Sequence, residues 1–240
     1  MADVPDPDFF FPNMAVGFTE FGTPTYGPDL HNPAPAAVLG DELDNRLQRA
    51  AVIATGNTKF SATMWVKTTD PTTIDEHFIN QFNLGSGSGM FLSLAPSGRF
   101  DIQARTSATA STITHAASTL GDDVYQHIGL TIDGKTGVSD AELKLFLAGI
   151  QPSYSGENLH TGNGFGSFPA GTGGQAFSVG GSPDFARFFN GSIARLKLWI
   201  NTALTTAEML QENINEVAAI GSNNSLFPDG STPRISLYPG

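Results

Sequence analysis

Apolar and polar residues alternate with a period of two in five stretches of the chain, the pattern of strands that bury one face. Residues 90–104 hold two of these stretches around Pro96-Ser97-Gly98 and predict a hairpin. Shorter strands are expected through Ala50–Ala54 and Phe177–Val179. The five apolar sets are Phe60, Ala62, Met64 and Val66; Met90, Leu92 and Leu94; Phe100, Ile102 and Ala104; Ile128, Leu130 and Ile132; and Leu143, Leu145 and Leu147.

The last strand signal is followed directly by a helix signal. Thr205 and Glu208 have the spacing of a capping box, which predicts a helix over about residues 206–220 that Gly221 can end. A further set recurs at helical spacing and predicts that this helix is amphipathic: Leu210, Ile214 and Val217. A strand is predicted after the turn dipeptide Asn190-Gly191, with one face formed by Ala194, Leu196, Leu198 and Ile200. One helix after many strands indicates a β-sandwich with a helical appendage.

Both ends of the chain differ from this pattern. Residues 1–36 are rich in proline, which cannot donate to an interior strand ladder, and predict an extended arm. The arm either lies across its own sandwich, expected at residues 37–221, or clasps a neighbouring subunit. Residues 222–240 are expected to form a second extended segment. The aromatic residues proposed to bind a partner are Phe9, Phe10, Phe11, Phe18, Phe21 and Tyr26.

Charge and composition narrow the range of partners. The 240 residues carry a formal net charge of −11, which disfavours binding to nucleic acid and to anionic membranes. The absence of cysteine removes disulfides and thiolate metal sites and favours folding in a reducing compartment. We expect neither a signal peptide nor a membrane-spanning segment, and therefore synthesis in a cytosol.

Four segments in order resemble the laminin G-like, pentraxin-related branch of the concanavalin A-like lectin/glucanase superfamily. The segments are FSATMWVKT (60–68), YQHIGLTIDG (125–134) with LKLFLAG (143–149), FSVGG (177–181) and FNGSIARLKLWINTALTTAEM (189–209). The chain departs from the family pattern at Tyr125, where tryptophan is usual, and at Ala148, where asparagine is usual. The resemblance covers roughly residues 45–215 and implies an all-β fold, a concanavalin A-like jelly-roll sandwich of two antiparallel sheets. It also implies a domain that binds glycans or proteins, in many relatives without catalysis.

The chemistry of the residues agrees with a protein that is not an enzyme. Glucanases of this fold use Glu-x-Asp-x-x-Glu, and Glu42 and Asp44 match the first two carboxylates, but Leu47 stands in place of the third. The five histidines have no paired i,i+2 or i,i+4 spacing, so no zinc site is expected. We expect His127 to face an edge or a loop. No cofactor is expected, except that relatives hold Ca²⁺ at the sandwich rim, for which Asp122 and Asp184 are the first candidates.

Two classes of function fit these expectations. The first is a structural protein of a virus particle, such as a bacteriophage decoration, cement or fibre-associated protein, made in the host cytoplasm and located in the virion. Its partners would be capsid or other virion proteins and further copies of itself, because such arms reach across symmetric contacts. The alternative is a carbohydrate-binding lectin module with a glycan partner and a dependence on Ca²⁺.

Overall fold

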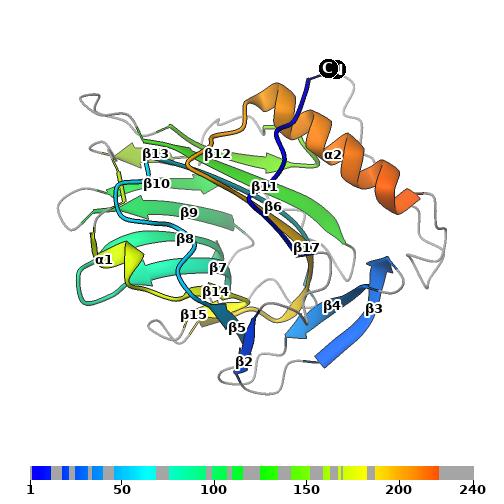
Figure 1. Cartoon of the computed structure of the whole chain (residues 1–240), viewed down its shortest axis with the longest axis horizontal. Coiled ribbons are helices and arrows are strands. Elements are labelled where there is room, and N and C mark those ends of the chain that lie inside the picture. The colour runs from blue at the N-terminus through cyan, green and yellow to red at the C-terminus, as the bar shows by residue number, and fades with distance from the viewer. Residues whose placement is uncertain are drawn as a thin grey trace.

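Two antiparallel sheets face each other in the structure, a computed structural model of the chain (Figure 1). It describes residues 2–11, 18–21, 25–31, 34–39, 46–68, 76–95, 99–106, 110–115, 125–134, 142–151, 159–162, 167–168, 170–182 and 187–221. The two sheets and the C-terminal helix confirm the predicted class of sandwich.

The described strands form a seven-stranded and an eight-stranded sheet. In spatial order the first contains β12 (Glu142–Leu147), β11 (Gln126–Asp133), β6 (Lys59–Thr68), β17 (Gly191–Ile200), β4 (Ala34–Leu39) and β3 (Thr25–His31), with β1 (Phe9–Phe11) also paired to β17. The second contains β13 (Leu159–Gly162), β10 (Ala110–His115), β9 (Arg99–Arg105), β8 (Ser88–Ala95), β7 (Glu76–Asn83), β14 (Phe177–Val179), β5 (Arg46–Arg49) and β2 (Thr19–Phe21). The remaining elements are the pair β15 (Gly181–Ser182) and β16 (Arg187–Phe188), and the helices α1 (Ala170–Gly173) and α2 (Thr206–Gly221).

The core lies between the sheets and is built from the alternating apolar positions. All five predicted sets belong to it, with Leu147 partly buried at the end of β12 and the others buried. Because side chains alternate across a strand, each set that points inward leaves an equal set that points outward. Burying each of the large apolar side chains in these sets, the alanines excepted, contributes about 1.5–3 kcal/mol, so the pattern itself accounts for the packing of the two sheets against each other.

A bulge in β17 changes which residues face the core. The strand register shifts at Arg195, whose φ of 50° lies in the left-handed region. Before the bulge Ala194 pairs with Trp65 on the outer face of the sheet, and after it Leu196 and Leu198 point into the core. The prediction that Ala194 shares a face with Leu196 and Leu198 is therefore wrong, because the extra residue shifts the alternation.

The segment after β5 buries Val52 and Ile53 but is not a strand. The strand predicted at Ala50–Ala54 is wrong, since the strand lies at Arg46–Arg49. The backbone N–H groups of Val52 and Ile53 instead donate to Oε1 of Gln81, at 3.0 Å each. A buried side chain from β7 thus satisfies backbone groups that a neighbouring strand would otherwise pair.

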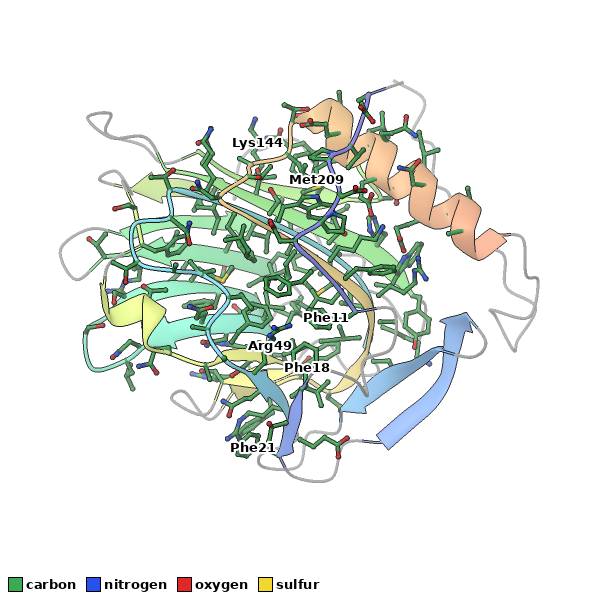
Figure 2. All side chains as sticks on the ribbon, viewed as in Figure 1. Phe11, Phe18, Phe21, Arg49, Lys144 and Met209 are labelled. Carbon is green, nitrogen blue, oxygen red and sulfur yellow. The ribbon has the colours of Figure 1, made fainter. Side chains whose placement is uncertain are left out.

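The described N-terminal residues contribute a strand to each sheet. β1 pairs with β17 and β2 pairs with β5, so this segment crosses from one sheet to the other. The guanidinium of Arg49 lies 4.4 Å from the ring centre of Phe9 and 5.0 Å from that of Phe11. The Phe11 ring also contacts Phe18, with ring centres 4.7 Å apart, and Figure 2 shows Arg49 between these parts of the segment. Residues 222–240 lie outside the described residues.

Helix α2 begins at the predicted capping box and lies along the outer face of the seven-stranded sheet (Figure 1). The Thr205 N–H donates to Oε2 of Glu208 at 2.6 Å, and the Glu208 N–H donates to Oγ1 of Thr205 at 3.3 Å. This reciprocal arrangement confirms the predicted start of the helix. Neither described helix is long and apolar enough to span a bilayer.

Helix α2 turns most of its predicted apolar set toward solvent. Leu210 and Ile214 are 43% and 48% exposed, whereas Glu212 and Glu216 are buried against the sheet. The reason is electrostatic, because the bulged strand presents cations to the helix. Nζ of Lys197 lies 2.6 Å from Oε1 of Glu212 and 2.7 Å from Oε1 of Glu216.

Candidate functional site

A row of five side chains crosses the outer face of the eight-stranded sheet at one level. The members are direct cross-strand partners on β5, β14, β7, β8 and β9: Gln48, Ser178, Asn80, Phe91 and Gln103. They point away from the core because their neighbours along the strands, such as Ile79, Leu92 and Ile102, fill it. We call this set the polar row. Nε2 of Gln48 donates to Oγ of Ser178 at 2.9 Å.

His77 packs on the aromatic member of this row. A bulge in β7 after His77 places both Phe78 and Ile79 in the core and leaves His77 on the outer face, opposite Ser93. The imidazole stacks on the Phe91 ring with centres 4.7 Å apart and planes inclined by 19°. Nδ2 of Asn80 lies 3.1 Å from Nδ1 of His77. Burial, with a smaller contribution from the Arg187 charge, lowers the pKa of His77 to about 3, so the ring is neutral at pH 7 and Asn80 donates to it.

A second aromatic side chain extends this cluster. The Phe82 ring meets Phe91 edge-on at 5.8 Å, and the guanidinium of Arg105 lies 5.8 Å from the Phe82 ring centre. Asp101 is the cross-strand partner of Ser93. We define the polar face as the polar row together with His77, Phe82, Ser93, Asp101 and Arg105.

The polar face has a buried floor and a more accessible rim. Asn80 is 3% exposed and Phe91 is 9% exposed. Four members are only half-buried: Gln48, Asp101, Gln103 and Arg105. Amide and hydroxyl groups both donate and accept hydrogen bonds, so the face suits a ligand rich in hydroxyl groups. Asp101 is the single carboxylate among the ten residues, whereas glycoside hydrolysis requires two that flank the bond.

The sequence alone did not single out these residues. The alternation within residues 90–104 identified the inward positions, and the outward positions of the same hairpin carry Phe91, Ser93, Asp101 and Gln103. Polar and aromatic side chains on the outward side of this hairpin indicate a binding surface, so the sequence did carry a signal for these four residues. The contributions of His77 and Asn80 were hidden, because the bulge after His77 breaks the period-two pattern of β7.

The residues predicted to hold a metal lie outside the described part of the chain. Asp122 and Asp184 both belong to undescribed segments, as do Glu42 and Asp44 of the partial glucanase pattern. Leu47 lies fully buried in β5. Within the described ranges, no three side chains of His, Cys, Asp or Glu are grouped as metal ligands. The calcium site therefore stays a prediction.

The aromatic residues predicted to bind a partner have different surroundings. Phe9 and Phe11 pack toward the core, and Phe18 lies against Phe11. The Phe21 ring lies 4.2 Å from the Arg46 guanidinium carbon. Phe10 points outward and is 41% exposed, with its ring over Arg195 and Lys197 on β17. The Tyr26 side chain lies outside those described, and the role of the six residues in binding a partner stays a prediction.

The predicted environment of His127 is wrong. The side chain faces α2 and is 4% exposed, with its ring centre 5.2 Å from that of Trp65. Burial lowers the pKa of His127 to about 4, although the Glu216 carboxylate raises it and the Lys197 charge lowers it further. The sequence could not show that a helix covers His127, because the residues that cover it come from α2, almost ninety positions later in the chain.

A hollow of about 380 Å³ lies at the start of α2 and is a weaker candidate. Its lining consists of Thr131, Asp133, Lys144 and residues 203–207. The one lining carboxylate, Asp133, lies 3.4 Å from Nζ of Lys59. The helix start is already capped by Thr205 and Glu208, so the hollow presents few uncommitted groups to a ligand.

A sequence model of one protein family matches most of the sandwich. The family is described as the concanavalin A-like lectin/glucanases superfamily, and its model matches residues 42–209. In a sequence comparison, no curated protein matches the chain.

Three of the solved structures that share this fold concern botulinum neurotoxins. One comes from work on cell entry of botulinum neurotoxin type C, dependent upon interaction with two ganglioside molecules (10% identity, TM-score 0.55). The others are the binding domain of botulinum neurotoxin DC in complex with rat synaptotagmin II (9% identity, TM-score 0.56) and with SialylT (8% identity, TM-score 0.56). Each match covers 82% of this chain and 46% of the other, so the chain spans about half the length of those proteins. At such identities the likeness shows a lectin-like fold alone.

Proposed function

The chain belongs to the concanavalin A-like lectin/glucanase superfamily, and from this premise we propose that it binds carbohydrate through the polar face without transforming it. The observation that carries the proposal is the polar row, which aligns three amide side chains, a hydroxyl and an aromatic ring across five strands. Binding sites combine apolar contact area with a few fixed polar groups that give orientation and specificity.

The half-buried rim would make the first contacts with a glycan. Gln48 and Gln103 occupy the two ends of the polar row, and both retain exposure. Phe91, His77 and Asn80 lie between them as a floor whose hydrogen bonds and ring stacking already fix their positions. A preorganised floor lowers the entropy lost on binding. The ten residues contain one carboxylate, which supports binding without hydrolysis.

Isothermal titration calorimetry after a glycan array tests this proposal. We expect the intact chain to bind at least one glycan on the array, and Gln103→Ala to weaken that binding at least fivefold. Gln126→Ala is the matched control, because Gln126 is also a half-buried glutamine on a strand but lies in the seven-stranded sheet. It should leave the affinity unchanged.

Three outcomes would contradict this proposal. A blank array across diverse glycans would remove the carbohydrate ligand. Equal binding by Gln103→Ala and the intact chain would move the site away from the polar face. Release of reducing sugar from a bound polysaccharide would show that the protein is an enzyme. Loss of binding in EDTA would instead support the predicted calcium site, and would direct attention to Asp122 and Asp184.

As a second candidate we propose a structural protein of a virus particle, located in the virion after synthesis in the host cytoplasm. The observation that favours it is the exposed Phe10 ring on the N-terminal segment, since an exposed aromatic side chain suits contact with another subunit. Mass spectrometry of purified particles should then find the chain, and Phe10→Ser should reduce the amount retained while the isolated protein stays folded. Absence of the chain from particles would exclude this candidate without affecting the carbohydrate proposal.

A further inference from the structure

Arg105 closes one edge of the polar face, two residues beyond Gln103 on the same side of β9. Its guanidinium lies 5.8 Å from the Phe82 ring centre, and its cross-strand partner on β8 is Gly89, which places no side chain opposite it. The Nε atom is shielded from solvent, and no acceptor in the described part of the chain bonds to it. A buried donor without an acceptor is unfavourable, so a ligand that supplies an acceptor at Arg105 removes this cost.

Arg195, on the other sheet, shows what such an acceptor looks like. Its Nε and Nη2 donate to the two carboxylate oxygens of Glu216. The planar guanidinium matches a carboxylate in this way, with two parallel hydrogen bonds. Arg105 carries the same set of donors against the Phe82 ring. A ligand carboxylate at Arg105 would therefore repeat an arrangement that the fold already uses.

The described charges around the polar face are mostly positive. Arg46 points outward from β5, because the residue after it fills the core. The charge of Arg187 reaches the imidazole of His77 in the floor of the face. Together with Arg105, these residues are three cations near one carboxylate, that of Asp101. The face is therefore favourable for an anionic group.

The acidic character of the whole chain does not oppose this local charge. The net charge is −11, but exposed charges more than about 8 Å away are largely screened at physiological ionic strength. Glu20 and Glu76 belong to strands of the same sheet but pair with core leucines, so they point to its other side. Asp101 and Arg105 lie four residues apart on an extended strand, about 13 Å, so a carboxylate at Arg105 is largely screened from Asp101.

We propose that the polar face selects acidic glycans, with the carboxylate of the sugar bound by Arg105 and its hydroxyl groups bound by the polar row. This inference rests on the proposed carbohydrate function and adds the class of sugar, one that carries a carboxylate, such as a uronic or sialic acid. It also orients the ligand. The acidic group lies at the edge formed by Arg105 and Phe82, and hydroxyl groups donate to Asp101, which accepts hydrogen bonds when ionised.

A glycan array of matched pairs tests the selectivity. Each oligosaccharide that contains a uronic or sialic acid is printed beside its carboxyl methyl ester, which keeps the sugar and removes the charge. We expect the intact chain to prefer the acids. Calorimetry on the best pair should give about tenfold tighter binding of the acid than of the ester, the size of effect expected for hydrogen bonds to a charged group.

Variants at one position test the role of Arg105. Arg105→Gln should weaken binding of the acid to the level of the ester, and Arg105→Lys, which keeps the charge but loses the paired donors, should retain part of the preference. Lys67→Gln is the matched control and should keep the full preference. Lys67 is also a half-buried cation beside a ring, with Nζ 5.4 Å from the Tyr125 ring centre, but it lies on the seven-stranded sheet. An unchanged circular dichroism spectrum would show that each variant folds.

The contrary outcomes separate this inference from the function on which it rests. If the intact chain binds esters as tightly as acids, the selectivity is absent but the carbohydrate proposal stands. A folded Arg105→Gln variant that still prefers acids, or a Lys67→Gln variant that loses the preference, would show that Arg105 does not read the carboxylate. If Arg105→Gln does not fold, full preference in Arg105→Lys would overturn the paired hydrogen bonds. A blank array of acids and esters would remove the carbohydrate proposal itself.

Discussion

Arg195 and Glu216 form a bidentate ion pair between β17 and α2. Nε of Arg195 lies 2.6 Å from Oε2 of Glu216 and Nη2 lies 2.9 Å from Oε1, with both side chains at least nine-tenths buried. The indole N–H of Trp65 also donates to Oε2, at 3.2 Å. The left-handed backbone at Arg195 creates the bulge at which this residue faces the helix. The bulge, the ion pair and the inward turn of the α2 glutamates are therefore parts of one arrangement.

Removing one partner should destabilise the fold strongly. We expect Glu216→Ala to lower the free energy of unfolding by about 3 kcal/mol, because the change leaves the Arg195 charge buried without its partner. Glu208→Ala on the same helix removes only one half of the capping box, so its cost should stay near 1 kcal/mol. Urea denaturation of both variants measures the two values. Equal losses would show that the inward ion pair is no more important than the cap.

The two histidines that lie buried in the described part of the chain, His77 and His127, should make stability depend on pH. The pKa is lowered by burial to about 3 for His77 and about 4 for His127, from 6.5 in the unfolded chain. Below pH 6.5 the unfolded chain therefore binds protons that the folded chain does not bind. Stability should fall as the pH falls from 6.5 toward 4, by up to about 1.4 kcal/mol per pH unit for each histidine.

Denaturant unfolding at several values between pH 5 and 7 checks this dependence. His127→Gln should remove roughly half of the slope, because one of the two buried imidazoles is then absent. An unchanged slope in this variant would show that His127 takes up its proton normally. Below pH 4.5 a further loss of stability is expected, because Glu216 takes up a proton in the unfolded chain before it does so in the folded chain. Burial alone would raise its pKa, but the Arg195 hydrogen bond and the neighbouring cations hold that pKa at about 2.

The period-two pattern was sufficient to predict the sandwich but could not predict its irregular positions. Strands such as β6 and β11 alternate without interruption, so the inward residues follow directly from the sequence. The bulges at His77 and Arg195 each insert a residue into the pattern, and nothing in the local sequence marks them. The orientation of α2 depends on one of these bulges. The start of the helix at Thr205 therefore follows from the sequence, but the side that meets the sheet does not.

The polar face could be predicted only in part, because its residues come from five strands spread over the chain. Gln48 and Ser178 are 130 positions apart and yet share a hydrogen bond. Sequence spacing identifies residues that point outward, but which outward residues become neighbours depends on strand order. Strand order follows from the packing of the whole sandwich, which a single sequence constrains only weakly.

A side chain at Gly149, in the turn after β12, should destabilise the fold. Its φ of 75° disfavours other residues, and a β-carbon there would lie 2.8 Å from Cβ of Asn213 and 2.9 Å from Cα of Leu210. Gly56 has a similar φ of 85° but open space around it. A substitution at Gly56 therefore measures the backbone strain alone, without a steric clash. We expect Gly56→Ala to cost about 1 kcal/mol and Gly149→Ala at least twice as much in urea denaturation. Similar costs would show that α2 moves freely away from the turn.

Two adjacent aromatic residues near the N-terminus, Phe10 and Phe11, should differ in how much they stabilise the fold. Phe11 is 8% exposed and packs into the core beside Arg49 and Phe18, whereas Phe10 is 41% exposed on the other side of β1. We expect Phe11→Ala to lower the free energy of unfolding by about 3 kcal/mol, because it opens a cavity between the sheets. Phe10→Ala should cost less than about 1 kcal/mol. If both variants were as stable as the intact chain, the N-terminal segment would contribute little to its own sandwich, and its aromatic residues would be available to clasp a neighbouring subunit.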